Sequence, residues 1–271
     1  FHPTSLYNPG ERPSFLITEA MRGFGGLLRL QNGKEFMQKY HPMGSLAPRD
    51  VVARSIDHEL KISGEEFVYL DITHKDPKEV MSHFPNIYKK CLSIGIDLTK
   101  DMIPVVPAAH YCCGGIKVNL NGESSIRRLY ALGEASSTGL HGGNRLASNS
   151  MMEAAVYADA AARHAISVID SIELQRDIPA WDYEGTAVPE EMALITQDYK
   201  EMQQIMTNYV GIVRSDVRLE RAKRRLEIIF KETEELYLKS TLSQHLCELR
   251  NMIAVGYLII KQAEARHESV G

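Results

Sequence analysis

The stretch TGLHGGNRLASNSMME, residues 138–153, sets the expected fold of this chain. Its glycines, at 139, 142 and 143, predict a turn that brings His141 and Arg145 directly ahead of a helix. The predicted helix start is a capping box, in which Ser150 accepts the backbone N–H of Glu153 and Glu153 reaches back to Ser150. Helix starts of this kind offer unpaired N–H groups and the positive end of the helix dipole. The residues alone therefore predict an anion or cofactor site.

Length and composition leave most function classes open. The 271 residues can form one large or two modest domains, and the formal charge of −4 gives no indication of nucleic-acid binding. No apolar run approaches the roughly 20 residues of a membrane helix. The four cysteines lack paired CxxC spacing, which favours reduced thiols over a disulfide framework or a zinc site. We therefore expect a cytoplasmic protein with no metal, no nucleic-acid partner and no membrane partner.

Apolar periodicity and turn residues predict an α/β part followed by helices. Strands are expected at 1–7, 67–73, 116–120 and 127–136, the last two as a hairpin that turns at Asn121-Gly122. Helical segments are expected at 16–26, 49–63 and 76–95, followed by a long alanine-rich helix from Ser150. Beyond a linker at 178–189, three more helices are expected at about 190–209, 213–238 and 241–267.

A family resemblance is carried by five motifs in order along the chain: FHPTSLY at 1–7, LAPRDVVAR at 46–54, AAHYCCGGI at 108–116, GEASSTGL at 133–140 and HGGNRLASNSMMEA at 141–154. Together they resemble the L-aspartate oxidases, a branch of the succinate dehydrogenase and fumarate reductase flavoprotein family. Within that family, AAHY, CGG, LAPRD and LASNS favour the aspartate-oxidising branch. The resemblance covers nearly the whole chain and is strongest over residues 1–165.

The fold that the resemblance implies is α/β plus α, in three parts. We expect an α+β capping domain at 1–109, the C-terminal part of an FAD-binding Rossmann-like domain at 110–177, and a C-terminal three-helix bundle at 178–271. A flavin enzyme of this family needs a GxGxxG after a strand for the pyrophosphate, and none occurs in the sequence. We therefore expect a C-terminal fragment that is inactive in isolation and lacks the residue that reads the substrate amine.

The resemblance implies a site for a dicarboxylate substrate. In the family, residues matching His2, His110 and Arg145 bind the two carboxylates, and the planar fork of arginine suits such a group. Taken alone, His2 reads as an ordinary polar residue and His110 as a histidine satisfied by backbone groups. Their assignment to the substrate therefore depends on the family.

Three further residues are expected to be catalytic. Arg49 heads an expected helix and, taken alone, reads as a surface partner of Asp50 or Glu59; the resemblance makes it a substrate-binding residue that relays protons. Thr18 and Glu19 alone read as a helix cap and a solvated charge. In the family, the matching Thr-Glu pair lies at the substrate.

The cofactor that the resemblance implies is FAD, bound non-covalently. Glu134 is predicted at a strand end, where nucleotide-binding α/β folds hold a ribose hydroxyl, and the family match assigns it to the flavin ribose. The backbone N–H groups of Ser150 and Met151 would lie near the isoalloxazine O2 and N1, where a helix start stabilises the reduced flavin. Phe24 stands where the family usually has glutamate, and no function is assigned to it.

The implied reaction is oxidation of L-aspartate to iminoaspartate by hydride transfer to FAD. Oxygen or fumarate would reoxidise the flavin, and the product would pass to quinolinate synthase for NAD biosynthesis. Two alternatives stay open. The same carboxylate site suits a succinate dehydrogenase or fumarate reductase, and a chain without the dinucleotide loop could be a non-catalytic fragment that binds dicarboxylates or other proteins.

Overall fold

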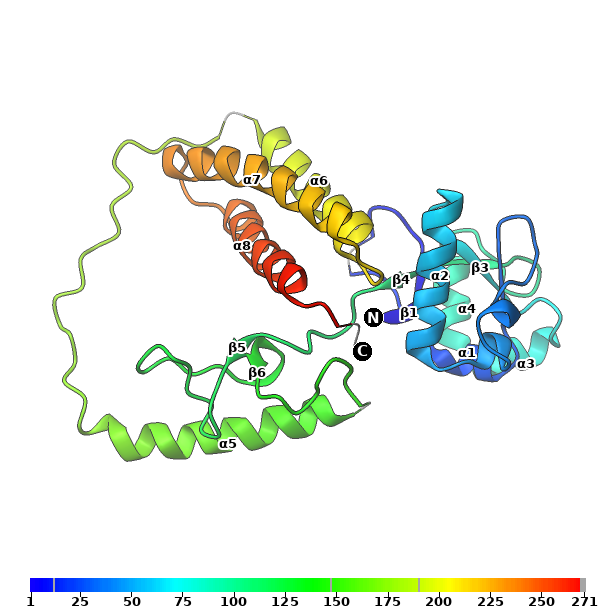
Figure 1. Ribbon diagram of the computed structural model, residues 1–271, viewed down its shortest axis with the longest axis horizontal. Helices are drawn as coiled ribbons and strands as arrows, with labels where there is room; N and C mark the ends of the chain where they lie inside the picture. Colours follow the sequence, from blue (N-terminus) through cyan, green and yellow to red (C-terminus); the bar gives the residue numbers. More distant parts are fainter. Residues whose placement is uncertain (12, 147, 190, 269–271) are drawn as a thin grey trace. The chain divides into compact units, whose positions relative to one another are not determined.

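The computed structural model describes residues 1–11, 13–146, 148–189 and 191–268. The chain divides into two compact units, Phe1–Ala161 and the part that begins at Ala162. The first unit combines helices with sheets, and the second is helical. The predicted mixture of helix and sheet with a helical C-terminal part is therefore confirmed (Figure 1). The three-part division of the chain stays a prediction.

The first unit is built on a four-stranded antiparallel sheet in the order β1-β4-β3-β2. Its strands are β1 (His2–Leu6), β2 (Leu27–Arg29), β3 (Val68–Asp71) and β4 (Ile103–Ala108). The strands expected at 1–7 and 67–73 are confirmed as β1 and β3. Strand β4 was not expected, because Pro104 and Pro107 interrupt it and proline cannot donate to a sheet.

Helices α1 (Glu19–Gly23) and α2 (Arg49–Ser63) agree with the expected helical segments. The helix expected at 76–95 is instead two helices, α3 (Pro77–His83) and α4 (Pro85–Leu92). Pro85 lacks the N–H that would continue α3, so the chain begins a new helix there. Asp76 caps α3, since its Oδ1 accepts the backbone N–H groups of Lys78 at 2.9 Å and Glu79 at 3.1 Å.

A continuous core joins α1, α2 and the sheet. Met21 of α1, Ile56 of α2, Leu28 of β2 and Leu70 of β3 have no solvent-exposed surface. The apolar positions of α2 recur every four residues, so one face of the helix packs against β1 and β4. This packing fixes the N-terminal end of α2, where Arg49 lies, relative to His2 at the start of β1.

The hairpin expected between 116–120 and 127–136 is wrong. The structure has two short strands there, β5 (Ile116–Lys117) and β6 (Ser136–Ser137), and they pair in parallel. Left-handed conformations at Gly122 (φ 73°), Arg128 (φ 71°) and Gly133 (φ 61°) turn the chain away from an extended path. Glu134 consequently lies in a 3₁₀ turn, Gly133–Ala135, and not at the end of a return strand.

Helix α5 (Asn149–Ile169) follows the glycine-rich turn. The predicted capping box is wrong, because Ser150 is the second residue of the helix and not its cap. Glu153 does not reach back to Ser150; its carboxylate is bound by Thr138, His141 and Tyr111 instead. The predicted long helix is nevertheless present.

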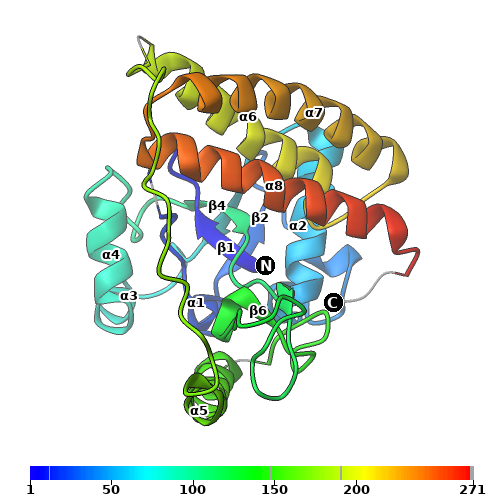
Figure 2. The ribbon, with the colours of Figure 1, turned by 90° about the vertical axis from the view of Figure 1, so that its left-hand side faces the viewer.

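The second unit packs three helices side by side, as Figures 1 and 2 both show: α6 (Met192–Val210), α7 (Asp216–Lys239) and α8 (Gln244–Ala265). Leu226 of α7 and Leu246 of α8 lie in their shared core. These helices and the linker before α6 confirm the expected order of elements. No helix in the described part of the chain is long and apolar enough to cross a membrane.

Candidate active site

Three charged side chains meet where α1 faces the start of α2. Thr18 caps α1 by accepting the N–H of Ala20 at 3.3 Å, which places Glu19 in the first turn. The Nε of Arg49 lies 3.0 Å from Oε1 of Glu19, and its Nη2 donates to Oε2 at 3.2 Å. The Nη2 of Arg22 lies 3.6 Å from Oε1 of the same carboxylate. The structure thus brings the predicted residues Glu19 and Arg49 together.

Neither surface partner considered for Arg49 from the sequence is used. Asp50 pairs with Arg54 on the outside of α2. Glu59 is buried and is bound by Tyr40 and Lys39. The sequence does not show this arrangement, since Glu19 and Arg49 are thirty residues apart.

Arg22 is a residue of this site that sequence reasoning missed. Its side chain is buried and its Nη1 donates to the carbonyl oxygens of Ser45 at 2.8 Å and Ala47 at 3.1 Å. Burial lowers the pKa of Arg22, whereas the nearby Glu19 raises it and Arg49 lowers it. Its position three residues after Glu19, on the same face of α1, was the only available signal.

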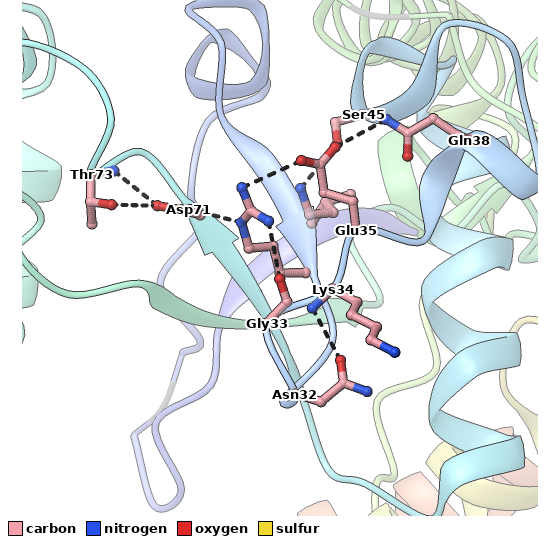
Figure 3. Close-up of polar contacts among 10 residues, drawn as sticks. Asn32, Gly33, Lys34, Glu35, Gln38, Ser45, Asp71 and Thr73 are labelled. Atoms are coloured by element: carbon pink, nitrogen blue, oxygen red, sulfur yellow. Dashed lines mark hydrogen bonds and ion pairs between the residues drawn. The ribbon is translucent and has the colours of Figure 1, made fainter.

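A second polar network braces the segment that leads to α2. The guanidinium of Arg29 in β2 contacts the carboxylates of Asp71 at 2.7 Å and Glu35 at 3.3 Å, and donates to the carbonyl of Gly33 at 3.0 Å (Figure 3). Ser45 is held to the same strand, because its Oγ accepts the N–H of Leu28 at 3.0 Å. These contacts fix the carbonyl groups to which Arg22 is bound.

His2 and His110 form the next part of the site. Their rings meet edge to face with centroids 5.7 Å apart. Burial lowers the pKa of His2 to about 4, with His110, Arg49 and Arg22 contributing in the same direction against Glu19. His2 is therefore neutral at neutral pH, and its Nδ1 accepts the N–H of Thr4 at 3.3 Å. The ring proton must then be on Nε2, which is free to donate to a carboxylate.

Arg145 lies over an aromatic ring that follows His110 directly. Its guanidinium carbon is 4.4 Å from the centroid of the Tyr111 ring. Among the described residues no carboxylate pairs with this guanidinium, and its buried Nε has no hydrogen-bond partner. A half-buried arginine without a counter-ion is costly unless an anion binds it. The arrangement therefore suits a carboxylate ligand.

The residues assigned to the cofactor are compatible with a large planar ligand. Glu134 is exposed, and its Oε1 accepts the N–H of Cys112 at 2.9 Å, which leaves Oε2 without a described partner. A side chain added at Gly139 or Gly142 would meet nothing within 4 Å, so the turn ahead of α5 is open. Met151 is 77% exposed at the start of α5, where the first N–H groups have no intrahelical partner.

Ser150 also lies in this first turn of α5 and is partly exposed.

Phe24 packs against the rings of His83 at 4.7 Å and Phe84 at 5.5 Å. Phe24 therefore contributes to the apolar packing of the first unit.

Curated relatives match the chain along its whole length. It is 48% identical to an L-aspartate oxidase of Pseudomonas aeruginosa, covering 100% of this chain and 50% of the relative. It is 49% identical to an L-aspartate oxidase of Acinetobacter baylyi, again covering 50% of the relative. A chloroplastic L-aspartate oxidase of rice is 42% identical, with 45% of its length covered. The chain thus spans about half the length of the curated relatives it matches.

Solved structures share the fold. A quinol-fumarate reductase structure with menaquinol molecules matches with a TM-score of 0.79 at 29% identity, covering 100% of this chain and 52% of that chain. The apo form of a Mycobacterium smegmatis Sdh1 complex matches with a TM-score of 0.75 at 30% identity and 47% coverage of that chain. Residues 199–271 match the family described as fumarate reductase flavoprotein C-term. Residues 1–151, more than half of the chain, match the FAD binding domain family, and the chain therefore belongs to that family of flavoproteins.

Proposed function

We propose that the protein to which this chain belongs oxidises L-aspartate to iminoaspartate with non-covalently bound FAD. The observation that carries the proposal is the guanidinium of Arg145, which stacks on Tyr111 and pairs with no carboxylate among the described residues. Tyr111 follows His110, whose ring meets that of His2. The relatives named L-aspartate oxidase support the choice of substrate.

Binding of the two carboxylates is the first role of the site. Arg145 offers a planar fork of donors to one carboxylate. His2 donates from Nε2, and His110 is exposed beside it with no other described ring or hydrogen-bond partner than His2. A substrate held at both ends presents one C–H bond in a fixed direction. Orientation of this kind lowers the activation barrier by up to about 7–11 kcal/mol.

Proton transfer is the second role. Oxidation of the amine removes a hydride from Cα and a proton from the nitrogen, and bound FAD supplies the hydride acceptor. Glu19 and Arg49 form the acid–base pair, because they are in direct contact at the edge of the same site. Thr18 orients Glu19 by capping α1, and buried Arg22 approaches Oε1, the carboxylate oxygen that Nε of Arg49 also contacts.

The cofactor is held by residues of 110–177 in this proposal. Glu134 would bind a ribose hydroxyl through the carboxylate oxygen that has no described partner, and the N–H groups of Ser150 and Met151 would donate to the flavin. The layout with a capping part at 1–109 and a helical part at 178–271 belongs to the same proposal. So do oxygen or fumarate as electron acceptor, transfer of the product to quinolinate synthase and a cytoplasmic location.

Succinate dehydrogenase or fumarate reductase is the second candidate. The matching solved structures belong to those enzymes, and a site that binds two carboxylates suits succinate equally. The two functions differ in the substrate amine. A residue that recognises the amine would be a carboxylate with no cation partner of its own. Among the described residues of this site, Glu19 is already paired with Arg49 and Arg22, so none meets this requirement.

Product analysis on the whole flavoprotein tests the proposal. L-Aspartate under air should give ammonia and oxaloacetate in equal amounts, because iminoaspartate hydrolyses in water. Succinate should give no fumarate. Fumarate formation without aspartate turnover would favour the second candidate. A colourless protein with neither reaction would favour the non-catalytic alternative.

A further inference from the structure

Glu153 in α5 is a buried carboxylate that the proposed reaction does not use. It is 3% exposed. Burial raises the pKa of Glu153, but hydrogen bonds from Thr138 and His141 outweigh burial and hold the pKa below its ordinary value. The group is thus a carboxylate at neutral pH, and a buried charge of this kind is retained only where several donors surround it.

Its donors come from separate segments of the chain. Nε2 of His141 donates at 2.7 Å, since a carboxylate can only accept. The Oγ1 of Thr138 donates to the other carboxylate oxygen. The hydroxyl of Tyr111 donates at 3.3 Å. One side chain therefore joins the strand-to-helix turn to the segment that follows β4.

Through Tyr111 the network reaches Arg145. The Tyr111 ring carries the guanidinium of Arg145 at 4.4 Å and meets the His141 ring edge-on, with centroids 5.4 Å apart. Glu153 fixes both rings, Tyr111 through its hydroxyl and His141 through Nε2. The direction of Arg145 thus depends on a carboxylate that it does not touch.

The same network binds the first half of the glycine-rich turn at two points. Thr138 and His141 lie on either side of Gly139, and Gly142 and Gly143 follow. Glycine gives such a turn many accessible conformations. Conformational entropy is lost when the turn adopts the single conformation of the site. Two bonds from the turn to one buried carboxylate select a single conformation.

We infer that Glu153 is a positioning residue of the dicarboxylate site, which holds the 138–145 turn and the Tyr111 ring so that Arg145 is preorganised for the substrate carboxylate. This inference rests on the proposed function, because it concerns the same site. A purely structural role for Glu153 is the competing explanation. It predicts a loss of stability and no change in how the folded protein binds a dicarboxylate.

Calorimetric titration of the whole flavoprotein with succinate distinguishes a positioning role of Glu153 from a purely structural one. Glu153→Gln keeps the shape and removes the charge, and should raise the Kd for succinate on the order of tenfold. The KM for L-aspartate should rise by a similar factor, and kcat should fall less. Tyr111→Phe keeps the ring and removes only the hydroxyl, so its Kd should rise by a smaller factor.

Glu59→Gln is the matched control. Glu59 is also a buried glutamate on a helix, and it accepts the hydroxyl of Tyr40 at 2.5 Å and pairs with Lys39. Its replacement should lower the melting temperature and leave the Kd for succinate unchanged. A Glu153→Gln protein that melts earlier but binds succinate as tightly as the wild type would overturn the inference.

The wild-type titration separates this inference from the proposed function. Wild-type protein that binds no dicarboxylate would remove the proposed function and the inference with it. Wild-type binding with an unchanged Kd in Glu153→Gln would remove the inference alone. If Glu153→Gln does not fold, an unchanged Kd in Tyr111→Phe is sufficient to overturn it.

Discussion

Arg49 meets Glu19 with two nitrogens, Nε 3.0 Å from Oε1 and Nη2 donating to Oε2 at 3.2 Å, across thirty residues of sequence. Arg22 approaches the same carboxylate from within α1 at 3.6 Å. One carboxylate thus lies between two guanidinium groups, of which Arg22 is buried and Arg49 is partly exposed. Glu19 and Arg49 are each 32% exposed, so the cluster is accessible to solvent.

Removing the charge of Glu19 should lower the rate of catalysis and leave substrate binding nearly unchanged. Glu19→Gln should lower kcat for L-aspartate by about 10²-fold or more, the size of a lost acid–base contribution. The Kd for succinate should change by less than about threefold, since Arg145 and the two histidines stay in place. Asp50→Asn serves as the control, because Asp50 lies next to Arg49 in the first turn of α2 but is paired with Arg54. Equal effects of the two substitutions on kcat would contradict the role of Glu19.

Arg145 should be required for binding. Arg145→Ala should raise the Kd for succinate at least about 100-fold, because a bidentate charge-assisted contact is lost. Arg250→Ala is the control: Arg250 also lies 4.4 Å from a tyrosine ring, that of Tyr237, but is paired with Glu234. It should lower stability slightly and leave binding unchanged. Tight succinate binding by Arg145→Ala would show that the carboxylate lies elsewhere.

His2 should make the fold sensitive to acid. Its pKa is lowered from 6.5 to about 4 on folding, so between these values the unfolded chain binds more protons than the folded one. The free energy of unfolding should therefore fall as pH decreases through this window, by at most about 3 kcal/mol from this group. Above pH 6.5 both states are neutral and the effect is absent.

Denaturant unfolding at pH 7 and pH 4.5 measures this contribution. His2→Gln should lose less stability between the two pH values than the wild type does. His245→Gln, at an exposed position of α8, should lose as much as the wild type. An acid sensitivity that is the same in all three proteins would contradict a neutral, buried His2.

The second unit should depend on its apolar core. Leu226 of α7 is 1% exposed, and Leu226→Ala should lower the free energy of unfolding by about 2–5 kcal/mol because a cavity forms. Ile228 lies two residues further on the same helix and is 58% exposed. Ile228→Ala should change stability by less than about 0.5 kcal/mol. Denaturant unfolding followed by helical circular dichroism measures both free energies. Similar losses of unfolding free energy for the two substitutions would contradict the packing of α7.

Where local signals and packing agree, the sequence predicts the fold well. The apolar spacing of α2 locates that helix, and Asp76 followed by Pro77 locates the start of α3. The hairpin predicted at 116–136 is wrong because the alternating apolar residues of this segment do not pack. Ile116 is 46% exposed and Leu120 is 83% exposed. Alternation predicts a strand only where one face is buried, and neither side chain has a core to enter.

Sequence motifs select candidate site residues and do not give their arrangement. The family resemblance selects Glu19, Arg49 and Arg145, and the structure shows Glu19 and Arg49 in contact. It gives no indication that Arg22 is buried against two carbonyl groups or that Glu153 binds the turn ahead of α5. Such contacts depend on tertiary distances, which periodicity and motif spacing do not encode.

Anaerobic reduction of the flavin is the most direct test of the account. The whole flavoprotein is mixed with L-aspartate, and separately with succinate, while flavin absorbance is followed. L-Aspartate should bleach the flavin, and the Arg145→Ala protein should remain oxidised under the same conditions. Bleaching by succinate alone would contradict the assignment to aspartate, and bleaching of Arg145→Ala at the wild-type rate would contradict the site itself.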